Sequence, residues 1–403
     1  MRERVLYVAP LNPFMPGGGS QATRAYMDAT LEIFGRNKVD VMVNKGVLVP
    51  DKYKGINFIF VPQRPKLLSY VLFSFGVLGR FAVYVARYLN SHREQYQCCI
   101  INGSLESGWC FKHVEDSGVE KVTIHHNQEV KYCMDTKNIL TLRGKWPYMV
   151  LQAEKIAYKY SDYNLFLTQY DMDCMKKEYG YTKAKNRLIG TFDYKDARVI
   201  RPRKEGKDFH IVASGTMSHY QTIHGIMDFY NRYYSIARKL IPNLKVLLTG
   251  RNPSIEIRRL EESKNDITIV PNPENIMDQV QRGQFYLCPT DIGSGLKLRA
   301  MDGLKSGLPV LVHEVSARGY DYYYDKPYYR IYTDESSFER GLKEILSFLK
   351  HTPDSEIIIN HDYYDYFGFS KGTERLKTAL GGGKNGVKHL IIVRLHTYCL
   401  KAA

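Results

Sequence analysis

Residues 291–309 read DIGSGLKLRAMDGLKSGLP, and the interpretation of the whole chain starts from this stretch. Gly293 and Gly295 flank Ser294, so the backbone here can come close to a ligand. The pattern predicts a helix that begins near Leu296 and directs free N–H groups and the positive end of its dipole at an anion. We therefore expect this loop and helix to hold a phosphate group.

Charged side chains on the same helix extend this expectation to a nucleoside diphosphate. Lys297 and Arg299 add mobile positive charge, and Asp302 can accept hydrogen bonds from ribose hydroxyls. The alternative is an ordinary surface helix that ends at Gly307. Gly303 argues against it, because a glycine inside a helix costs about 1 kcal/mol relative to alanine and indicates a close approach.

This motif resembles that of the retaining glycosyltransferases of family 4. Many members read Gly-x-Gly-x-Lys-x-Lys-x-x-Glu, followed by Gly-x-Pro-Val. The resemblance implies an α/β chain with the GT-B fold, in which two Rossmann-like domains face each other across a cleft. It implies that Asp302 takes the ribose role usually filled by Glu, and it places Ser294 where many members carry another Glu near the donor sugar. The matching residues are Gly293, Gly295, Lys297, Arg299, Asp302, Gly307, Pro309 and Val310.

The length and composition agree with a two-domain α/β protein. The chain has 403 residues, more than one hydrophobic core usually supports, and 44% of them are hydrophobic. Short β-branched runs alternate with amphipathic segments, the pattern of parallel sheets. Strands are expected at residues 5–8, 39–43, 58–61, 99–101, 122–124 and 164–167, and then at 210–213, 246–249, 267–270, 285–288 and 310–313.

These strands and the breaks between them suggest the domain limits. The first, acceptor-side domain is expected at residues 1–190, and the polar, basic segment 191–208 is the predicted linker. The nucleotide-sugar-binding domain follows at 209–360, and a closing helix at 361–380 crosses back to the first domain, as the resemblance implies. Residues 381–403 form a basic and apolar tail to which the sequence assigns no role.

Cysteine usage and the N-terminus suggest a location. The seven cysteines are an odd number and include no Cys-x-x-Cys pair, which argues against a disulfide framework and a zinc site. The apolar run at residues 5–8 is too short for the hydrophobic region of a signal peptide. We therefore expect a cytoplasmic protein, either free or peripheral on the inner face of the membrane.

The net charge of +15 raises the affinity for any polyanion. No recognisable nucleic-acid-binding motif is present, so we expect no nucleic acid partner. Residues 66–89 are almost wholly apolar and aromatic, but Arg80 and Arg87 make a membrane span expensive. Two interpretations remain: a helix in the lipid headgroup region, which would give a peripheral membrane contact, and a buried helix of the first domain.

A second glycine cluster lies near the N-terminus. Residues 16–20 read PGGGS, and a helical pattern follows at 21–34, with Ser20 as the expected N-cap. The loop lacks the Gly-x-Gly-x-x-Gly spacing of dinucleotide sites, which disfavours a nicotinamide enzyme. The resemblance implies that Gly18 and Gly19 form the first-domain wall against the donor diphosphate; a flexible surface loop is the alternative.

The strand at residues 122–124 leads into His125-His126-Asn127-Gln128-Glu129, where cleft residues of an open α/β domain tend to lie. Family members often have His-Asn-x-Glu here. The resemblance therefore implies that His126 contacts the transferred sugar or the acceptor, with His125 as the second choice. Adjacent residues on a strand point to opposite faces, so the two histidines do not predict a metal site.

Asp171-Met172-Asp173 has the Asp-x-Asp form with which glycosyltransferases of another fold hold the cation of a nucleotide. Thr168 lies three residues earlier, at the start of the helical stretch 168–180. A helix-capping turn with acidic residues in its first turn explains both aspartates. No metal and no cofactor are therefore predicted.

Two cations that the family usually has in the second domain are absent, because Thr216 and His224 occupy their positions. A diphosphate still needs positive charge in a cleft of low dielectric. Lys297, Arg299 and Arg251 are expected to supply it, although Arg251 is equally explained as a solvated loop residue.

The sequence thus predicts a metal-independent, retaining glycosyltransferase that uses a UDP- or GDP-linked sugar. The expected acceptor is a hydroxyl of a glycan or a lipid-linked glycan in bacterial surface polysaccharide or glycoconjugate synthesis. Two alternatives remain open. One is a GT-B enzyme that epimerises a nucleotide sugar, and the other is a non-catalytic nucleotide- or glycan-binding protein with a degenerate cleft.

Overall fold

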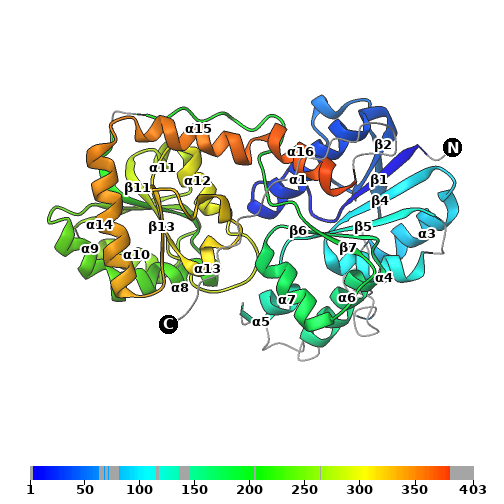
Figure 1. The fold of residues 1–403 in the computed structure, drawn as a ribbon, viewed down its shortest axis with the longest axis horizontal. Helices are drawn as coiled ribbons and strands as arrows, with labels where there is room; N and C mark the ends of the chain where they lie inside the picture. Colours follow the sequence, from blue (N-terminus) through cyan, green and yellow to red (C-terminus); the bar gives the residue numbers. More distant parts are fainter. Residues whose placement is uncertain are drawn as a thin grey trace.

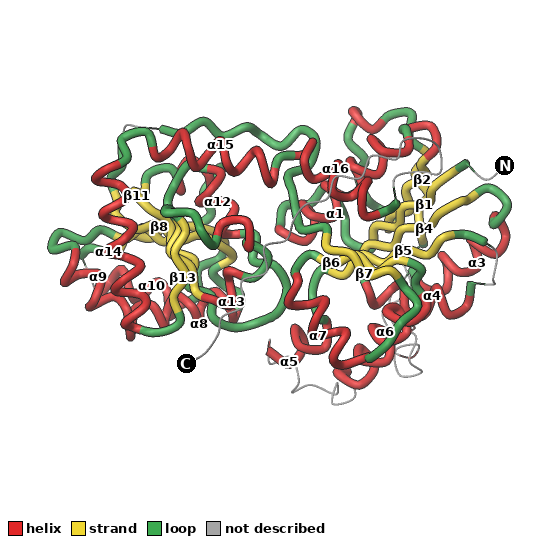
Figure 2. Tube along the Cα trace, in the orientation of Figure 1, coloured by secondary structure: helices red, strands yellow, loops and turns green. Residues whose placement is uncertain are grey.

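The chain folds into two α/β lobes that lie side by side (Figure 1). Each lobe contains a parallel sheet with helices on both faces (Figure 2). The structure is a computed structural model. It describes residues 3–62, 68, 71, 81–114, 118–135, 146–203, 206–263 and 265–381.

The first lobe is built on a parallel sheet of seven described strands in the order β3-β2-β1-β4-β5-β6-β7. Both faces of this sheet are covered, so its central strands are continuous apolar runs. In β1, Val5, Tyr7 and Ala9 face one core, while Leu6 and Val8 face the other. The strands are β1 (Arg4–Ala9), β2 (Val39–Asn44), β3 (Asn57–Val61), β4 (Tyr96–Asn102), β5 (Glu120–His125), β6 (Tyr163–Phe166) and β7 (Lys185–Leu188).

The second lobe repeats this plan with six described strands in the order β10-β9-β8-β11-β12-β13. Neighbouring positions of β8 again alternate, with Ile211 and Ala213 in one core and Val212 in the other. The strands are β8 (Phe209–Thr216), β9 (Val246–Arg251), β10 (Ile267–Pro271), β11 (Gly283–Cys288), β12 (Val310–His313) and β13 (Tyr329–Tyr332).

Helices connect successive parallel strands, as parallel pairing requires. Those of the first lobe are α1 (Gly18–Phe34), α3 (Ala82–His92), α4 (Ser104–His113), α5 (Glu129–Asp135), α6 (Trp146–Tyr160) and α7 (Gln169–Tyr179). Those of the second lobe are α8 (Tyr220–Asp228), a π-helical turn (Phe229–Tyr233), α9 (Tyr234–Leu240), α10 (Ile255–Ser263), α11 (Ile276–Val280), α12 (Arg299–Lys305), α13 (Glu314–Ala317) and α14 (Glu335–His351). Short 3-10 turns lie at Arg36–Lys38, Asp51–Tyr53 and Asp321–Tyr323.

The C-terminal helices join the two lobes. α15 (Ser355–Phe367) runs along the second lobe, and α16 (Phe369–Ala379) lies beside α1 of the first (Figure 1). Leu376 is buried in the first-lobe core. Arg375 fixes the helix to the chain between the lobes, donating to the carbonyls of Ile189 at 3.1 Å and Thr191 at 3.0 Å.

Some local expectations were wrong. The helix after the glycine loop begins at Arg299, three residues beyond Leu296. Ser20 lies inside α1, which Gly17 precedes as its N-cap. The sequence did not predict the edge strands β7 and β13. The close approach at Gly303 comes from the protein itself, because a Cβ there would lie 2.6 Å from the Cβ of Tyr286.

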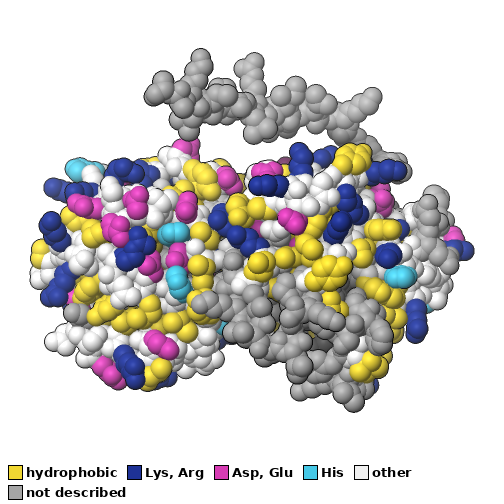
Figure 3. All heavy atoms as spheres, turned by 90° about the horizontal axis from the view of Figure 1, so that it is seen from below, with side chains coloured by type: hydrophobic (Ala, Val, Ile, Leu, Met, Phe, Trp, Pro, Cys, Tyr) yellow, Lys and Arg dark blue, Asp and Glu magenta, His cyan; other side chains and the backbone are white. Residues whose placement is uncertain are grey.

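The apolar segment 66–89 is described only at residues 68, 71 and 81–89. In this part α3 is packed against the first sheet, with Val85 and Leu89 buried and Arg87 exposed. Arg80 and the tail after residue 381 lie outside the described residues. Within the described part of the chain, no helix is both long and apolar enough to span a bilayer. On the face in Figure 3, basic and acidic side chains are interspersed over both lobes where atoms are coloured.

Gly108 allows α4 and α6 to pack with their backbones in contact. A Cβ at this position would lie 2.0 Å from the carbonyl oxygen of Ala153. Gly108→Ala is therefore expected to lower the free energy of unfolding by about 1 to 3 kcal/mol, despite the better helix propensity of alanine. Urea denaturation measures the change. Lys112→Ala, at an exposed position of α4, is the control, and equal stability of the two variants would contradict the packing argument.

Candidate active site

A cavity of about 1070 Å³ lies between the lobes and is lined by both. Most of its wall comes from segments that follow the carboxyl ends of strands, where open parallel sheets bind ligands. The first lobe contributes the segments after β1, β4 and β5, and the second lobe those after β8, β9 and β11.

The glycine loop forms part of the second-lobe wall. Gly293 (φ 99°) and Gly295 (φ 73°) adopt left-handed conformations that favour glycine. A Cβ on Gly295 would lie 2.8 Å from the Cβ of Asn127 and 2.9 Å from the carbonyl oxygen of His126. Ser294 is buried there. Gly295 and Ser294 line the cavity, but the space beside the Gly295 Cα is filled by Asn127 and the His126 carbonyl of the first lobe and is not open to a ligand.

Gly293 has a different neighbour. It is not among the described residues that line the cavity. A Cβ on Gly293 would lie 2.3 Å from Nε2 of Gln221 and 2.9 Å from Nζ of Lys297. Its missing side chain therefore leaves room for these two polar side chains.

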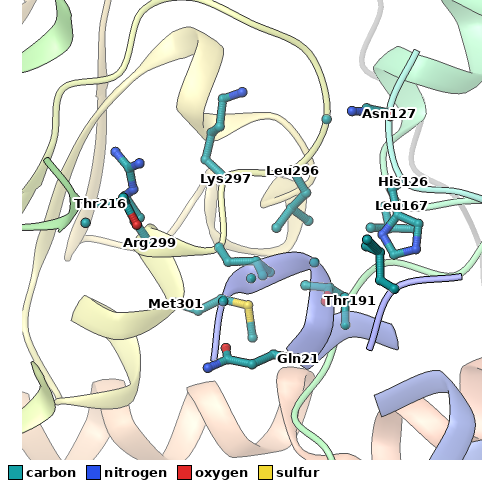
Figure 4. A pocket seen from close by; sticks show the side chains of 18 of the residues that line it. Gln21, His126, Asn127, Leu167, Thr191, Thr216, Leu296, Lys297, Arg299 and Met301 are labelled. Atoms are coloured by element: carbon teal, nitrogen blue, oxygen red, sulfur yellow. The ribbon is translucent and has the colours of Figure 1, made fainter. Parts of the chain in front are cut away.

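Arg299 and Lys297 extend along the same side of the cavity, with Arg299 beside Thr216 (Figure 4). The Arg299 guanidinium donates to Oγ1 of Thr222 at 2.6 Å and to Oγ1 of Thr290 at 3.3 Å. It packs against Gly215, where a Cβ would lie 2.7 Å from Cζ. Because these neighbours hold the guanidinium, its position is fixed before any ligand binds.

Lys297 and Arg299 are close enough to repel each other. The Lys297 ammonium donates to the carbonyl of Ser294 at 2.8 Å. Burial, with the nearby Arg299 charge, lowers the pKa of Lys297 to about 8. An anion bound between the two cations would favour the charged form of Lys297. Arg251, exposed at the end of β9, also lines the cavity.

Asp302 lies in the first turn of α12 and lines the cavity together with Lys305 and Leu296. Burial raises the pKa of Asp302 to about 7, against the opposing effect of Lys305 and Arg299. At neutral pH this carboxyl group can therefore both donate and accept hydrogen bonds.

The first-lobe wall holds His126 in a chain of hydrogen bonds. Nε2 of His126 lies 2.5 Å from Oδ1 of Asn102. The amide of Asn102 donates to Oγ1 of Thr23 at 2.7 Å, and Thr23 donates to the carbonyl of Gly19 at 2.7 Å. Since Oδ1 can only accept, this network assigns the proton of His126 to Nε2 and leaves Nδ1 as an acceptor. Burial lowers the pKa of His126 to about 4, so the ring is neutral at pH 7.

The other predicted residues of this wall lie as follows. Gly18 and Gly19 form the first turn of α1 and line the cavity. A Cβ on Gly18 would lie 2.8 Å from Cδ1 of Leu298, so the lobes also meet here. His125 is the buried last residue of β5, with its Nε2 3.0 Å from Oδ1 of Asn164, and does not line the cavity. The structure therefore brings His126 to the cavity, but not His125.

The fold of the chain matches solved structures of glycosyltransferases. Sucrose-phosphate synthase from Thermosynechococcus elongatus covers 94% of this chain with 98% of its own, at 14% identity and a TM-score of 0.67. Anabaena HepE in complex with UDP and glucose covers 94% of this chain with 100% of its own, at 13% identity and a TM-score of 0.63. The chain has the GT-B fold. WaaG, a glycosyltransferase involved in lipopolysaccharide biosynthesis, covers 94% of this chain with 100% of its own, at 13% identity and a TM-score of 0.58.

The likeness is one of structure. At the level of sequence, no protein family and no curated protein matches the chain. At 13% and 14% identity, the comparison shows that this chain shares the GT-B fold of those structures. It does not show that matching residues have the same roles. The roles of the cavity residues must therefore be argued from this chain alone.

Of Thr216 and His224, the two positions at which the resemblance predicts cations, only Thr216 lines this GT-B cleft. Thr216 lines the cavity at the end of β8. His224 is not among the described lining residues, and its Nδ1 lies 2.9 Å from Oδ1 of Asp291. Within the described part of the chain, no three His, Cys, Asp or Glu side chains come together in a way that could hold a metal ion.

Glu154 and Asn102 support the GT-B cleft but were missed at the sequence level. Glu154 is fully buried and accepts hydrogen bonds from the amide of Glu129 at 2.7 Å and from Tyr179 at 2.6 Å. Glu154 thus accepts a hydrogen bond from an amide at the start of α5 that has no partner within the helix. A charged residue inside the apolar pattern of α6 was the available signal for Glu154, whereas nothing near Asn102 marked it.

Glu129 lines the GT-B cleft in a low-dielectric setting beside Glu154. Burial, and then the neighbouring Glu154, raise the pKa of Glu129 to about 8. The native state therefore binds a proton that the unfolded chain releases near pH 4.5. The stability that protonation of Glu129 contributes to the native state is complete below pH 4.5 and is lost as the pH rises through 8.

Glu129→Gln is expected to remove this pH dependence. Between pH 5 and pH 9, the free energy of unfolding should fall by about 1 to 3 kcal/mol less in the variant than in the wild type. Urea denaturation across this range measures the difference. Glu120→Gln, at the exposed start of β5, is the control and should follow the wild type. Parallel curves for all three proteins would show that Glu129 does not titrate in this way.

Proposed function

We propose that this chain is a glycosyltransferase that moves a sugar from a nucleoside-diphosphate donor to a hydroxyl acceptor. The observation that carries the proposal is the division of charge in the interlobe cavity. Lys297 and Arg299 extend into it from the second lobe, while neutral His126 and the weakly acidic Glu129 line the first. Because HepE is a GT-B protein seen with UDP, glucose and UDP-glucose, its ligands support this class of donor.

In the proposed complex, the diphosphate lies against Lys297 and Arg299, with Arg251 at the rim. Fixed cations in a buried cleft bind phosphate strongly and cost little reorganisation. Asp302 takes the ribose hydroxyls, and its mixed donor and acceptor character suits them. UDP and GDP are the proposed donor nucleotides.

The same groups would favour sugar transfer. As the bond from the anomeric carbon to the β-phosphate breaks, negative charge grows on the departing oxygen, where Lys297 and Arg299 stabilise it. We propose that this protein charge acts without a metal ion and that the reaction retains the anomeric configuration. Nδ1 of His126 accepts a hydrogen bond from a sugar hydroxyl and orients the ring.

The proposed acceptor is a hydroxyl of a glycan or lipid-linked glycan in surface polysaccharide or glycoconjugate synthesis. The first-lobe wall beside Glu129 would receive it. We further propose that the enzyme acts in the cytoplasm, either free or peripheral on the inner face of the membrane. WaaG, another GT-B protein, is involved in lipopolysaccharide biosynthesis, which supports this class of pathway.

Nucleotide binding can be measured before any acceptor is known. At one hundred times its dissociation constant, UDP or GDP should stabilise the protein by about 2.7 kcal/mol in thermal unfolding. Asp302→Ala should weaken binding of that nucleotide by roughly 1 to 3 kcal/mol, because it removes the ribose contact. Asp321→Ala, at an exposed position of the same lobe, should bind as the wild type. If neither nucleotide stabilises the protein, the proposed donor site is wrong.

His126→Ala should separate sugar positioning from nucleotide binding. Because Nδ1 is assigned to the sugar, kcat should fall at least about tenfold while nucleotide affinity stays within about twofold. Steady-state transfer from UDP-glucose and calorimetry with UDP measure the two. The reverse pattern would move His126 into the nucleotide site.

NMR of the product tests whether the anomeric configuration is retained. Modified donor formed without any acceptor would indicate epimerisation.

A further inference from the structure

Asp171 lies where the two walls of the cavity meet. It stands in the first turn of α7 and is fully buried. Its Oδ1 accepts hydrogen bonds from the amide of Gln128 at 3.2 Å and the amide of Gly295 at 3.4 Å. Its Oδ2 accepts from the hydroxyl of Thr168, which in turn caps the helix by accepting from the Asp171 amide at 3.0 Å. One carboxylate oxygen therefore contacts the backbones of both lobes.

Two further side chains of the second lobe, Ser294 and Arg318, contact the first lobe near Asp171. The hydroxyl of Ser294 donates to the carbonyl of Gln128 at 3.1 Å. Arg318 of the second lobe stacks on the ring of Tyr170 at 3.8 Å and donates to the carbonyl of Gly293 at 3.4 Å. The glycine loop is thus attached to the start of α7 on one side and to the loop after β5 on the other.

We propose that Asp171 is a positioning residue that fixes the spacing between the two reactive walls of the cleft. The amide of Gln128 is two residues from His126, and the amide of Gly295 is two residues from Lys297. A carboxylate bound to both amides sets the distance between the group that orients the sugar and the group that receives the diphosphate. The inference deepens the proposed function, and its kinetic consequence rests on that function.

The capping role alone does not explain the position of Asp171. Thr168 already accepts the Asp171 amide, so α7 has its cap without a bond across the cleft. An isolated buried carboxylate is costly unless it is hydrogen-bonded, and here two of its partners are the backbone amides of the opposing walls. Release of these bonds would let the walls separate and admit water. Sugar transfer would then slow, and hydrolysis would account for a larger share of the donor consumed.

Hydrogen exchange of the unliganded, full-length protein tests the attachment directly. In Asp171→Ala, peptides covering residues 126–130 and 293–298 should both exchange about tenfold faster or more, as expected when bonds to a charged acceptor are lost. Asp173→Ala is the matched control, since Asp173 bonds only to Gln169 within α7 among the described residues. It should leave both peptides unchanged. Faster exchange confined to α7 would overturn the inference.

Two more variants keep the test decisive if Asp171→Ala does not fold. Asp171→Asn retains an oxygen for both amides and should exchange within about twofold of the wild type. Ser294→Ala removes a bond between the same walls without altering α7, and exchange at 126–130 should rise about fivefold. Unchanged exchange in Ser294→Ala, or wild-type exchange at 293–298 in a folded Asp171→Ala, would overturn the attachment.

With UDP-glucose and an accepted glycan, Asp171→Ala should lower the ratio of transfer to hydrolysis at least about tenfold, and Asp171→Asn should restore it. A wild-type ratio in Asp171→Ala would overturn the positioning role. The expected exchange result without any transferase activity in the wild type would instead count against the proposed function and leave the attachment standing.

Discussion

The cleft depends on backbone contact between the lobes at the glycine loop. Gly295 has no side chain and a left-handed conformation, so the second lobe can touch the carbonyl of His126 directly. Gly18 meets Leu298 at a second point of the same boundary. A side chain at Gly295 would meet the Cβ of Asn127 and the backbone of His126, so it would push the lobes apart and widen the space in which a substrate must be held.

Around this contact the protein buries ionisable groups without pairing them fully. Lys297 loses affinity for its proton, while Asp302 and Glu129 hold theirs more tightly. At neutral pH each shift costs stability relative to a solvated group, and for Glu129 and Asp302 this cost disappears as the pH falls. Such costs are typical of sites whose missing partner is a ligand. Lys297 is the clearest example, because a bound anion would offset the repulsion between Lys297 and Arg299.

The sequence predicted the fold from two kinds of pattern. Central strands such as 5–8 and 310–313 are continuous apolar runs, and a covered parallel sheet requires such runs. The edge strands β7 and β13 were not predicted, because Lys185–Leu188 is mostly polar and Arg330 interrupts the apolar run of Tyr329–Tyr332. Most of the glycine motif lies in one wall of the cavity, although Gly293 does not line it. The residues that hold the opposite wall, Asn102 among them, act through contacts between distant segments that no local pattern records.

The C-terminal helix has a consequence for how the chain is made. α16 covers α1, and Leu376 completes a core whose first strand begins at Arg4. During synthesis from the N-terminus, the first lobe is therefore left with an apolar face until the last described helix has left the ribosome. The first lobe is not an autonomous unit of the nascent chain. Its maturation waits for the second lobe, so the two halves of the cleft are completed together.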